Sequence, residues 1–364
     1  MKVKLEDVCE RGSSNLKQSD VEGKNGDYAV YGASGYIGSV DFYHQELPYV
    51  AVVKDGAGIG RTVLLPAKSS VIGTMQYLLP KRNVLPEYLG YVVRYMHLEK
   101  YFSGATIPHI YFRDYKNEEF NLVPADRQKE IVATLEKLEA IVSARRQQLQ
   151  KLDELVKSRF IELFGDQTAN PYAWQQTSIG ACCTLKSGTS LPADKENEGG
   201  AIPYVKVGDM NYPGNEQYIT TSSRFVSEQT AGAGVFPVGT VVFPKRGGAI
   251  GTNKKRLTRL PICADLNVMG VTAGRRLTPQ YLMAYFNTVD LGTLNNGSSV
   301  PQINNKDIAP LLICIPPMAL QEQFTAFVEQ TDKSKYYSSL SFRYCQAAEN
   351  AYRQEWITCR TSDF

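Results

Sequence analysis

Residues 124–164 read PADRQKEIVATLEKLEAIVSARRQQLQKLDELVKSRFIELF, and this stretch decides the architecture of the chain. Its apolar residues recur at alternating spacings of three and four, as in the seam of a coiled coil. They are Ile131, Leu135, Leu138, Val142, Leu149, Leu152, Val156 and Leu163, with Arg145 and Arg159 at interrupted seam positions. At about 1.5 Å per residue, such a helix would be roughly 55 to 60 Å long. The pattern predicts one long helix, residues 124–165, between two globular domains, residues 1–123 and 166–316.

The segments on either side of this helix are alike. Each has strand-like runs and glycine-rich turns, such as the predicted strands 49–53 and 62–65, followed by an amphipathic helix. At a constant offset of 193 positions, matching residues are Tyr88 and Tyr281, Leu89 and Leu282, Leu98 and Leu291, Gly104 and Gly297, Pro108 and Pro301, Ile110 and Ile303, Asp114 and Asp307, Pro124 and Pro317, and Gln128 and Gln321. Upstream the register slips by two, so that Lys54-Asp55-Gly56 faces Lys245-Arg246-Gly247. This agreement predicts an internal duplication.

A second helical pattern, residues 317–358, is the counterpart of the first in the repeat. Phe324 and Val328 stand opposite apolar seam residues, whereas Thr331 and Lys335 replace them further on. The expected fold is therefore α+β, with two duplicated mixed α/β domains separated by two long helices. We expect the helices to pack as an antiparallel coiled coil in a pseudo-twofold arrangement. The sequence after Ser341 is rich in Tyr and Gln without a clear heptad, which leaves its packing open.

Composition excludes several classes of protein. With 364 residues the chain is long enough for two domains of ordinary size. Its formal charge is +3. No apolar run is long enough to cross a bilayer, and the start MKVKLEDVCERG lacks an export signal, so we expect a cytoplasmic protein. Seven scattered cysteines favour reduced thiols over a disulfide framework. Three dispersed histidines do not predict a zinc site.

Local charge is more informative than the total. Residues 229–264 contain no acidic residue but six basic ones, and residues 56–86 are likewise free of acids. Two basic surfaces on a balanced protein suit contact with phosphates. The alternative is a solvated face whose acidic partners lie elsewhere in the fold.

The strongest candidate contacts lie in the second domain. Lys245 and Arg246 precede two glycines, which allow the backbone to approach DNA closely, and Asn253, Lys254, Lys255 and Arg256 follow. Arg can bridge O6 and N7 of guanine, Asn can pair with adenine, and Lys suits a phosphate. An ordinary β-hairpin with solubilising charges is the alternative. The first-domain counterparts are Lys54, Arg61 and His44.

Two further loops occupy equivalent positions in the two halves. The first contains Thr106 and His109, and the second contains Ser298, Ser299 and Gln302. Two similar domains held at a fixed separation suit the reading of two short DNA half-sites. A change from His109 to Gln302 is what two readers of different half-sites would show, although both loops are also compatible with structural turns capped by Ser or Thr. Further candidates on early loops are Tyr31, Ser34, Lys206 and Asp209.

Two motifs suggest an enzyme, and neither has the required context. The glycine-rich residues 55–60, DGAGIG, follow a strand as a methyltransferase cofactor loop would, but a strand-like run follows them instead of a helix. Residues 170–172, Asn-Pro-Tyr, are one proline short of an adenine methyltransferase motif and follow the end of a helix. No catalytic residue is predicted in this chain.

The order of domain, long helix, domain and long helix resembles the specificity subunit of Type I restriction-modification systems. The resemblance covers essentially the whole chain and includes YAVYGASGYIG, FPKRGGAIGTNKKR, SGATIPHI, GSSVPQI, PADRQKEIVATLEKLEAIV and PPMALQEQFTAFVEQTDKSK. It implies that the globular parts are target-recognition domains, that the helices are spacers, and that the chain catalyses nothing. Implied partners are double-stranded DNA, two modification subunits that bind S-adenosylmethionine and methylate adenine, and optionally restriction subunits. The segment after Ser341 departs from the family.

Two other functions remain open from the sequence. A stand-alone methyltransferase would bind S-adenosylmethionine as a purified chain. In a protein-binding scaffold, replacing Lys245 and Arg246 with alanine would leave any DNA affinity unchanged.

Overall fold

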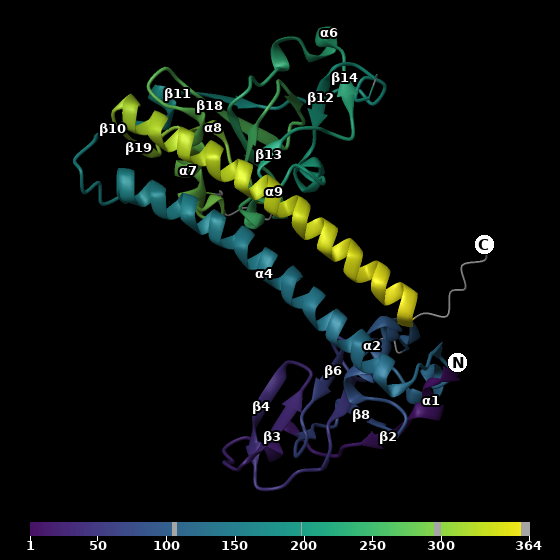
Figure 1. The fold of residues 1–364 in the computed structure, drawn as a ribbon. Coiled ribbons are helices and arrows are strands. Elements are labelled where there is room, and N and C mark those ends of the chain that lie inside the picture. The colour runs from purple at the N-terminus through teal and green to yellow at the C-terminus, as the bar shows by residue number, and fades with distance from the viewer. Residues whose placement is uncertain (104–107, 198, 295–299, 358–364) are drawn as a thin grey trace. The chain divides into compact units, whose positions relative to one another are not determined.

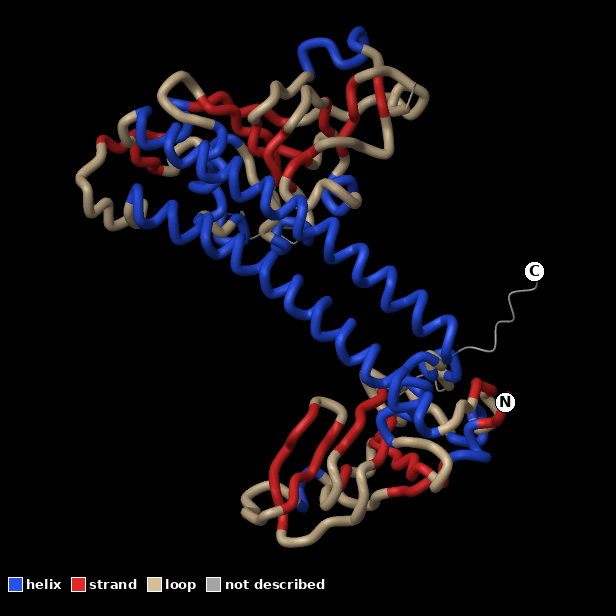
Figure 2. Tube along the Cα trace, viewed as in Figure 1, coloured by secondary structure: helices blue, strands red, loops and turns tan. Residues whose placement is uncertain are grey.

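A computed structural model describes residues 1–103, 108–197, 199–294 and 300–357 (Figure 1). The chain divides into two compact units. The first comprises Met1–Gln147 and Ser339–Phe364, and the second comprises Gln148–Ser338. Each unit thus combines one globular domain with segments of both long helices, while most of the rest of each unit is strand and loop (Figure 2).

The first unit contains a four-stranded sheet in the order β2-β8-β5-β6 and a three-stranded sheet in the order β4-β3-β7, with β1 pairing β9. Its short elements are β1 (Lys2–Lys4), α1 (Leu5–Val8), β2 (Cys9–Ser13), β3 (Tyr28–Gly32), β4 (Gly35–Val40), β5 (Tyr49–Val53), β6 (Thr62–Leu65), β7 (Ser70–Val71), β8 (Met75–Pro80), α2 (Pro86–Tyr95), α3 (Phe112–Tyr115) and β9 (Glu119–Asn121). The predicted strands 49–53 and 62–65 are confirmed as β5 and β6.

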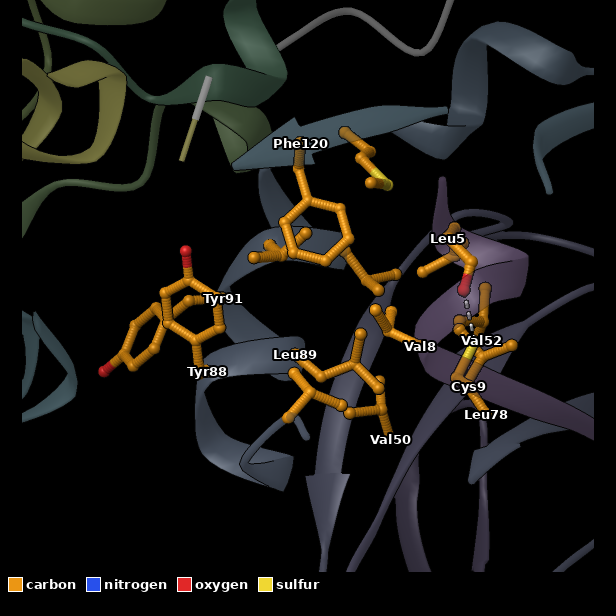
Figure 3. Close-up of a cluster of buried hydrophobic side chains, with 14 of the residues drawn as sticks. Leu5, Val8, Cys9, Val50, Val52, Leu78, Tyr88, Leu89, Tyr91 and Phe120 are labelled. Carbon is orange, nitrogen blue, oxygen red and sulfur yellow. Dashed lines mark hydrogen bonds between the residues drawn. The ribbon is translucent and has the colours of Figure 1, made fainter. Parts of the chain in front are cut away.

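The main core of the first unit lies between α2 and the larger sheet (Figure 3). Val50 and Val52 of β5 and Leu89 of α2 are fully buried there. Their positions follow from the sequence, because alternate residues of a strand share one face and residues three or four apart share one side of a helix. Val52 and Cys9 belong to the same cluster, and burial raises the pKa of the Cys9 thiol to about 12.

The second unit repeats this arrangement around a five-stranded sheet in the order β11-β18-β15-β16-β13 and a three-stranded sheet in the order β14-β12-β17, with β10 pairing β19. Its short elements are β10 (Gln175–Ser178), α5 (Ile179–Cys182), β11 (Cys183–Ser187), β12 (Ile202–Val205), β13 (Tyr218–Ile219), β14 (Phe225–Val226), α6 (Glu228–Ala231), β15 (Thr240–Pro244), β16 (Arg256–Thr258), β17 (Cys263–Ala264), β18 (Val268–Ala273), α7 (Pro279–Thr288), α8 (Asn305–Ile308) and β19 (Leu312–Ile315).

Two buried glutamines show the duplication at the level of single atoms. Gln128 accepts a hydrogen bond from Leu85 N at 2.8 Å and donates to Asn83 O and Val123 O. Gln321 makes the same three bonds, with Thr278 N, Arg276 O and Pro316 O, all at the offset of 193. A buried amide that satisfies three backbone groups anchors the start of each long helix to the loop before α2 or α7. The predicted duplication is confirmed.

The long helices are α4 (Ala125–Phe164) and α9 (Met318–Ile357). In the first unit, Arg127 lies over the ring of Trp356, and Arg146 lies over the ring of Phe342. Because higher numbers on α4 meet lower numbers on α9, the two segments run antiparallel, as predicted. The segment after Ser341, whose packing the sequence left open, continues α9, and Tyr352 and Trp356 pack against the core of the first unit.

The second unit contains the other segments of the same two helices. Asp153 forms an ion pair of 2.7 Å with Lys335, and Arg159 lies over the ring of Phe327, which is again antiparallel. Phe160 and Phe164 are buried against Phe324 and anchor α4 in this unit. The predicted seam did not include these phenylalanines, because its heptad register placed Arg159 and Leu163 at those turns. Within the described residues, neither long helix has the continuous apolar length that a bilayer requires.

Candidate nucleic-acid interface

In the first unit, two predicted candidate loops lie against each other. The loop after β5 is joined to the loop before α3 by hydrogen bonds from Gly56 N to Pro108 O and from Ile110 N to Lys54 O, both 2.9 Å long. Lys54 N also donates to Thr74 O at 3.0 Å, which ties this loop to the start of β8. Segments more than 50 residues apart thus form one framed surface at the end of the sheet.

The second unit has the same pair of bonded loops. We call each pair a frame: residues 54–56 with 108–110 in the first unit, and residues 245–247 with 301–303 in the second. Gly247 N donates to Pro301 O at 2.8 Å, and Ile303 N donates to Lys245 O at 2.9 Å. Gly247 has a φ of +74°, a left-handed conformation that favours glycine, where the loop turns away from β15. The two predicted loop pairs are therefore real structural counterparts, and each carries its own polar side chains.

The slip of two in the repeat register lies within this loop. Val50 pairs with Leu64 in the first unit and Val241 pairs with Leu257 in the second, so the offset is 191 before the loop and 193 after it. The loop between β15 and β16 is therefore two residues longer than the loop between β5 and β6. The extra length falls near Asn253, whose φ of +53° ends a short 3₁₀ turn. A loop can gain residues here without disturbing the strands on either side.

Lys245 and Arg246 differ in what they can contact. Lys245 is half-buried and its Nζ donates to Ser187 Oγ at 2.9 Å. Burial, with a smaller contribution from the neighbouring Arg246, lowers the pKa of its ammonium. Arg246 is exposed, and within the described part of the chain its guanidinium has no ion-pair partner. Arg246 is thus available to an incoming ligand.

The basic cluster that follows is used largely by the fold. Lys255 is only 4% exposed, and its Nζ donates to Val289 O and to Asn253 Oδ1. Burial lowers its pKa to about 8. Arg256 donates through Nη1 to Lys255 O and through Nη2 to Met210 O. We therefore do not expect Lys255 and Arg256 to contact DNA, because their cationic groups already donate to backbone oxygens.

The remaining members of this cluster have internal partners that leave part of each side chain accessible. Lys254 bonds to Asn211, and its side chain is only half-buried. Asn253 Oδ1 accepts from Leu291 N as well as from the buried lysine, so this side chain anchors the 3₁₀ turn that follows α7.

In the first unit, Asp55 stands at the position equivalent to Arg246. His109, the counterpart of Gln302, places Nδ1 at 2.6 Å from Asp55 Oδ1. Asp55 and Arg246 are also bridged by backbone pairing to His109 and Gln302, respectively. The two frames thus present an acid with an imidazole in one unit and a guanidinium with an amide in the other. Asp55 was missed as a site residue, because 54 positions separate it from His109 and only the fold joins them.

Other first-unit candidates surround this frame. Arg61 is exposed and its Nη1 donates to Ala33 O at 2.9 Å. Arg61, Ser34 and Thr74 line a cavity of about 310 Å³ beside the loop. Lys54 forms an ion pair of 3.4 Å with Asp55. The structure thus brings Lys54, Arg61, Ser34 and His109 into one neighbourhood.

Two first-unit candidates are engaged elsewhere. His44 Nδ1 lies 3.3 Å from Tyr77 OH, and this side chain does not belong to the frame. Tyr31 is half-buried on β3 and packs edge-on against the exposed Tyr36.

Lys206 and Asp209 are structural in the second unit. The Lys206 ammonium bonds to both carboxylate oxygens of Glu196 at 2.7 Å. Asp209 is 4% exposed, and its carboxylate accepts from Lys206 N, Ser223 N and Ser223 Oγ. These side chains stabilise a 3₁₀ turn, and we do not expect the buried Asp209 to contact DNA. Thr106, Ser298 and Ser299 lie outside the described residues.

The motifs that suggested an enzyme are structural. Residues 55–60 connect the antiparallel strands β5 and β6, so no helix follows the glycines. Asn170 bonds through both atoms of its amide to the backbone of Trp174 and closes a turn after α4. No group of acids, histidines and cysteines able to hold a metal occurs among the residues that the structure describes.

Comparisons with known proteins agree with this architecture. A family described as "Type I restriction modification DNA specificity domain" matches residues 1–154 and 171–336. The Type I restriction enzyme MjaIX specificity subunit of Methanocaldococcus jannaschii is 21% identical over 279 residues, which cover 69% of this chain and 63% of that protein. The chain therefore aligns with less than two thirds of this relative.

Solved structures show similarity of fold. The crystal structure of a Type I restriction-modification S subunit from M. genitalium superposes with a TM-score of 0.64 at 14% identity, covering 99% of this chain and 96% of the other. A chain from a study of complex assembly and conformational transition of the type I R-M system gives a TM-score of 0.56 at 16% identity, covering 98% and 96%.

Proposed function

The chain belongs to the Type I restriction-modification DNA specificity family, and from this premise we propose that it reads a bipartite, asymmetric DNA site with one domain per half-site. The chain itself is non-catalytic in this proposal. It docks two modification subunits, which carry S-adenosylmethionine and methylate adenine, and in some assemblies it also docks restriction subunits.

The observation that carries this proposal is the pair of equivalent frames with different side chains. The same backbone bonds place Asp55 and His109 in one domain where Arg246 and Gln302 stand in the other. A duplicated scaffold conserves geometry, whereas its polar groups set which base edges are accepted in the major groove. Two such readers on one chain imply two different half-sites, hence an asymmetric target.

The proposed contact set follows from exposure and internal bonding for the described residues, and from sequence position alone for Thr106, Ser298 and Ser299. In the first domain it contains Lys54, Arg61, Ser34, Thr106 and His109. In the second domain it contains Lys245, Arg246, Lys254, Ser298, Ser299 and Gln302. Arg246 and the two residues His109 and Gln302 are assigned to base edges, and the lysines to phosphates, because a lysine ammonium is a point charge without bidentate geometry.

The test is to co-express the chain with a modification subunit in cells that lack adenine methylation and to map methylated adenines across the genome. We expect a motif of two short half-sites with a fixed gap. Formation of the complex without any sequence motif would refute the proposal.

A second arm assigns each half-site. Replacing residues 1–123 with the corresponding domain of another specificity subunit should change one half of the motif and leave the other half intact. Purified chain without its partners should not bind S-adenosylmethionine. Binding of this cofactor by the isolated chain would favour a stand-alone methyltransferase instead.

A further inference from the structure

We propose that Asp55 and His109 form a base-reading dyad that accepts a hydrogen bond from an exocyclic amino group in the first half-site. The group in question is N6 of adenine or N4 of cytosine. The inference rests on the proposed function and adds to it the chemical class that one domain recognises.

The contact between the two side chains places a proton on Nδ1 of the imidazole. His109 Nδ1 lies 2.6 Å from Asp55 Oδ1. An ionised carboxylate only accepts hydrogen bonds, so the proton of this bond belongs to Nδ1. In a neutral imidazole Nε2 is then an acceptor. Among the described residues Nε2 has no hydrogen-bond partner, and the His109 side chain is 36% exposed.

The backbone holds the imidazole in place from two sides. His109 exchanges both backbone hydrogen bonds with Ser103, each 2.9 Å long. The neighbouring bond from Gly56 N to Pro108 O fixes the distance to the Asp55 loop. A reading group whose position is set by backbone bonds loses little conformational freedom when it binds.

Charged and aromatic groups flank both residues of the dyad. Lys54 Nζ lies 3.4 Å from Asp55 Oδ2 and balances the carboxylate. The ring of Tyr111 stacks on the imidazole, with the two ring centroids 6.3 Å apart. Arg113, on α3, lies 4.8 Å from the centroid of the Tyr111 ring. The dyad is therefore flanked by cations that can hold the DNA backbone.

The chemistry of the major groove then limits what the dyad accepts. Adenine and cytosine present amino donors there, whereas guanine and thymine present acceptors at the corresponding positions. The second domain carries Arg246 and Gln302 at the equivalent positions, so the second half-site serves as an internal control.

The experiment uses the full chain in complex with its modification subunit and a library of duplexes with every base pair of both half-sites varied. His109→Asn should reduce discrimination at one position of the first half-site by about 5-fold or more, the effect of one hydrogen bond. His97→Asn is the matched control. His97 also pairs with an acid, at 3.1 Å from Glu99, and its φ of +52° is one that asparagine tolerates.

A further arm tests the acceptor role. In Asp55→Asn the amide can donate or accept, so the preference for an amino group should weaken.

The outcomes separate the two proposals. If His109→Asn reads the first half-site as the wild type does, while Arg246→Ala alters the second, the dyad is refuted and the proposed function stands. A guanine preference at this position would also refute the dyad. If the wild-type complex shows no sequence preference at all, the proposed function fails, and the dyad with it.

Discussion

Replacing Arg246 with alanine is the most direct test of the second frame. The side chain is exposed and has no ion-pair partner within the described residues, so its removal should leave the fold intact. The whole effect should therefore appear in DNA binding. A bidentate contact from arginine to guanine contributes about 1 to 3 kcal/mol of discrimination, which corresponds to roughly 5- to 150-fold in affinity at one base pair.

The control is Arg275→Ala, which also removes one exposed arginine from the second unit. Sheet register separates the two sites. Pro244 pairs with Val268 at the beginning of β18, next to Arg246, whereas Arg275 follows the other end of this strand. Six residues at about 3.3 Å each place the arginines roughly 20 Å apart. Both variants have the same net charge, so only position distinguishes them.

The assay measures the Kd of the assembled complex for the cognate site and for every single-base variant, at several salt concentrations. Loss of discrimination at one base pair of the second half-site indicates a base contact. Uniform weakening, with a salt slope shallower by about 1, indicates a phosphate contact. If Arg246→Ala behaves as Arg275→Ala does in both respects, the second frame does not contact DNA, and the contact set proposed for it is wrong.

Three further substitutions test the scaffold. Gln321→Met leaves three buried backbone groups without their partner and should cost about 3 to 5 kcal/mol, whereas Gln323→Met on the exposed face of α9 should cost little; urea unfolding and hydrogen exchange of α7 compare them. Lys255 has its pKa lowered to about 8, so the unfolded chain binds the proton more tightly between about pH 8 and 10, and stability should rise across this window in the wild type. Lys255→Met should flatten that rise in urea midpoints, and an unchanged slope would contradict the burial argument. Gly60→Ala should destabilise the first unit by roughly 2 kcal/mol or more, because φ is +80° and the new Cβ would lie 2.5 Å from Glu99 N; thermal unfolding that matches the wild type would show that the loop rearranges at little cost.

The candidate site shows where sequence reasoning about charge is insufficient. Lys255 and Arg246 look alike in the sequence, as cations in one acid-free stretch. In the structure one is buried against the end of α7 and the other is exposed. The difference arises because Lys255, just before β16, bonds to Val289 O at the end of α7, whereas Arg246 lies in the loop two residues beyond the end of β15. Burial of a side chain depends on what packs over it, and that information lies in other parts of the chain.

The sequence by itself determined the long helices, the duplication and the strands β5 and β6. Each of these depends on local periodicity or on a match between two stretches, both of which can be read along the chain. Register at 193 positions even placed Gln128 and Gln321 as counterparts before their hydrogen bonds were known.

Only the tertiary structure decided which polar groups face one another. Asp55 meets His109 because two loops are joined by backbone hydrogen bonds, and the heptad seam gave no indication that Phe160 would be buried against Phe324. Both contacts join residues more than 50 positions apart, and nothing in the local pattern of either partner specifies the other. The physical reason is that hydrogen-bond geometry and burial are properties of the packed chain, whereas periodicity is a property of each segment alone.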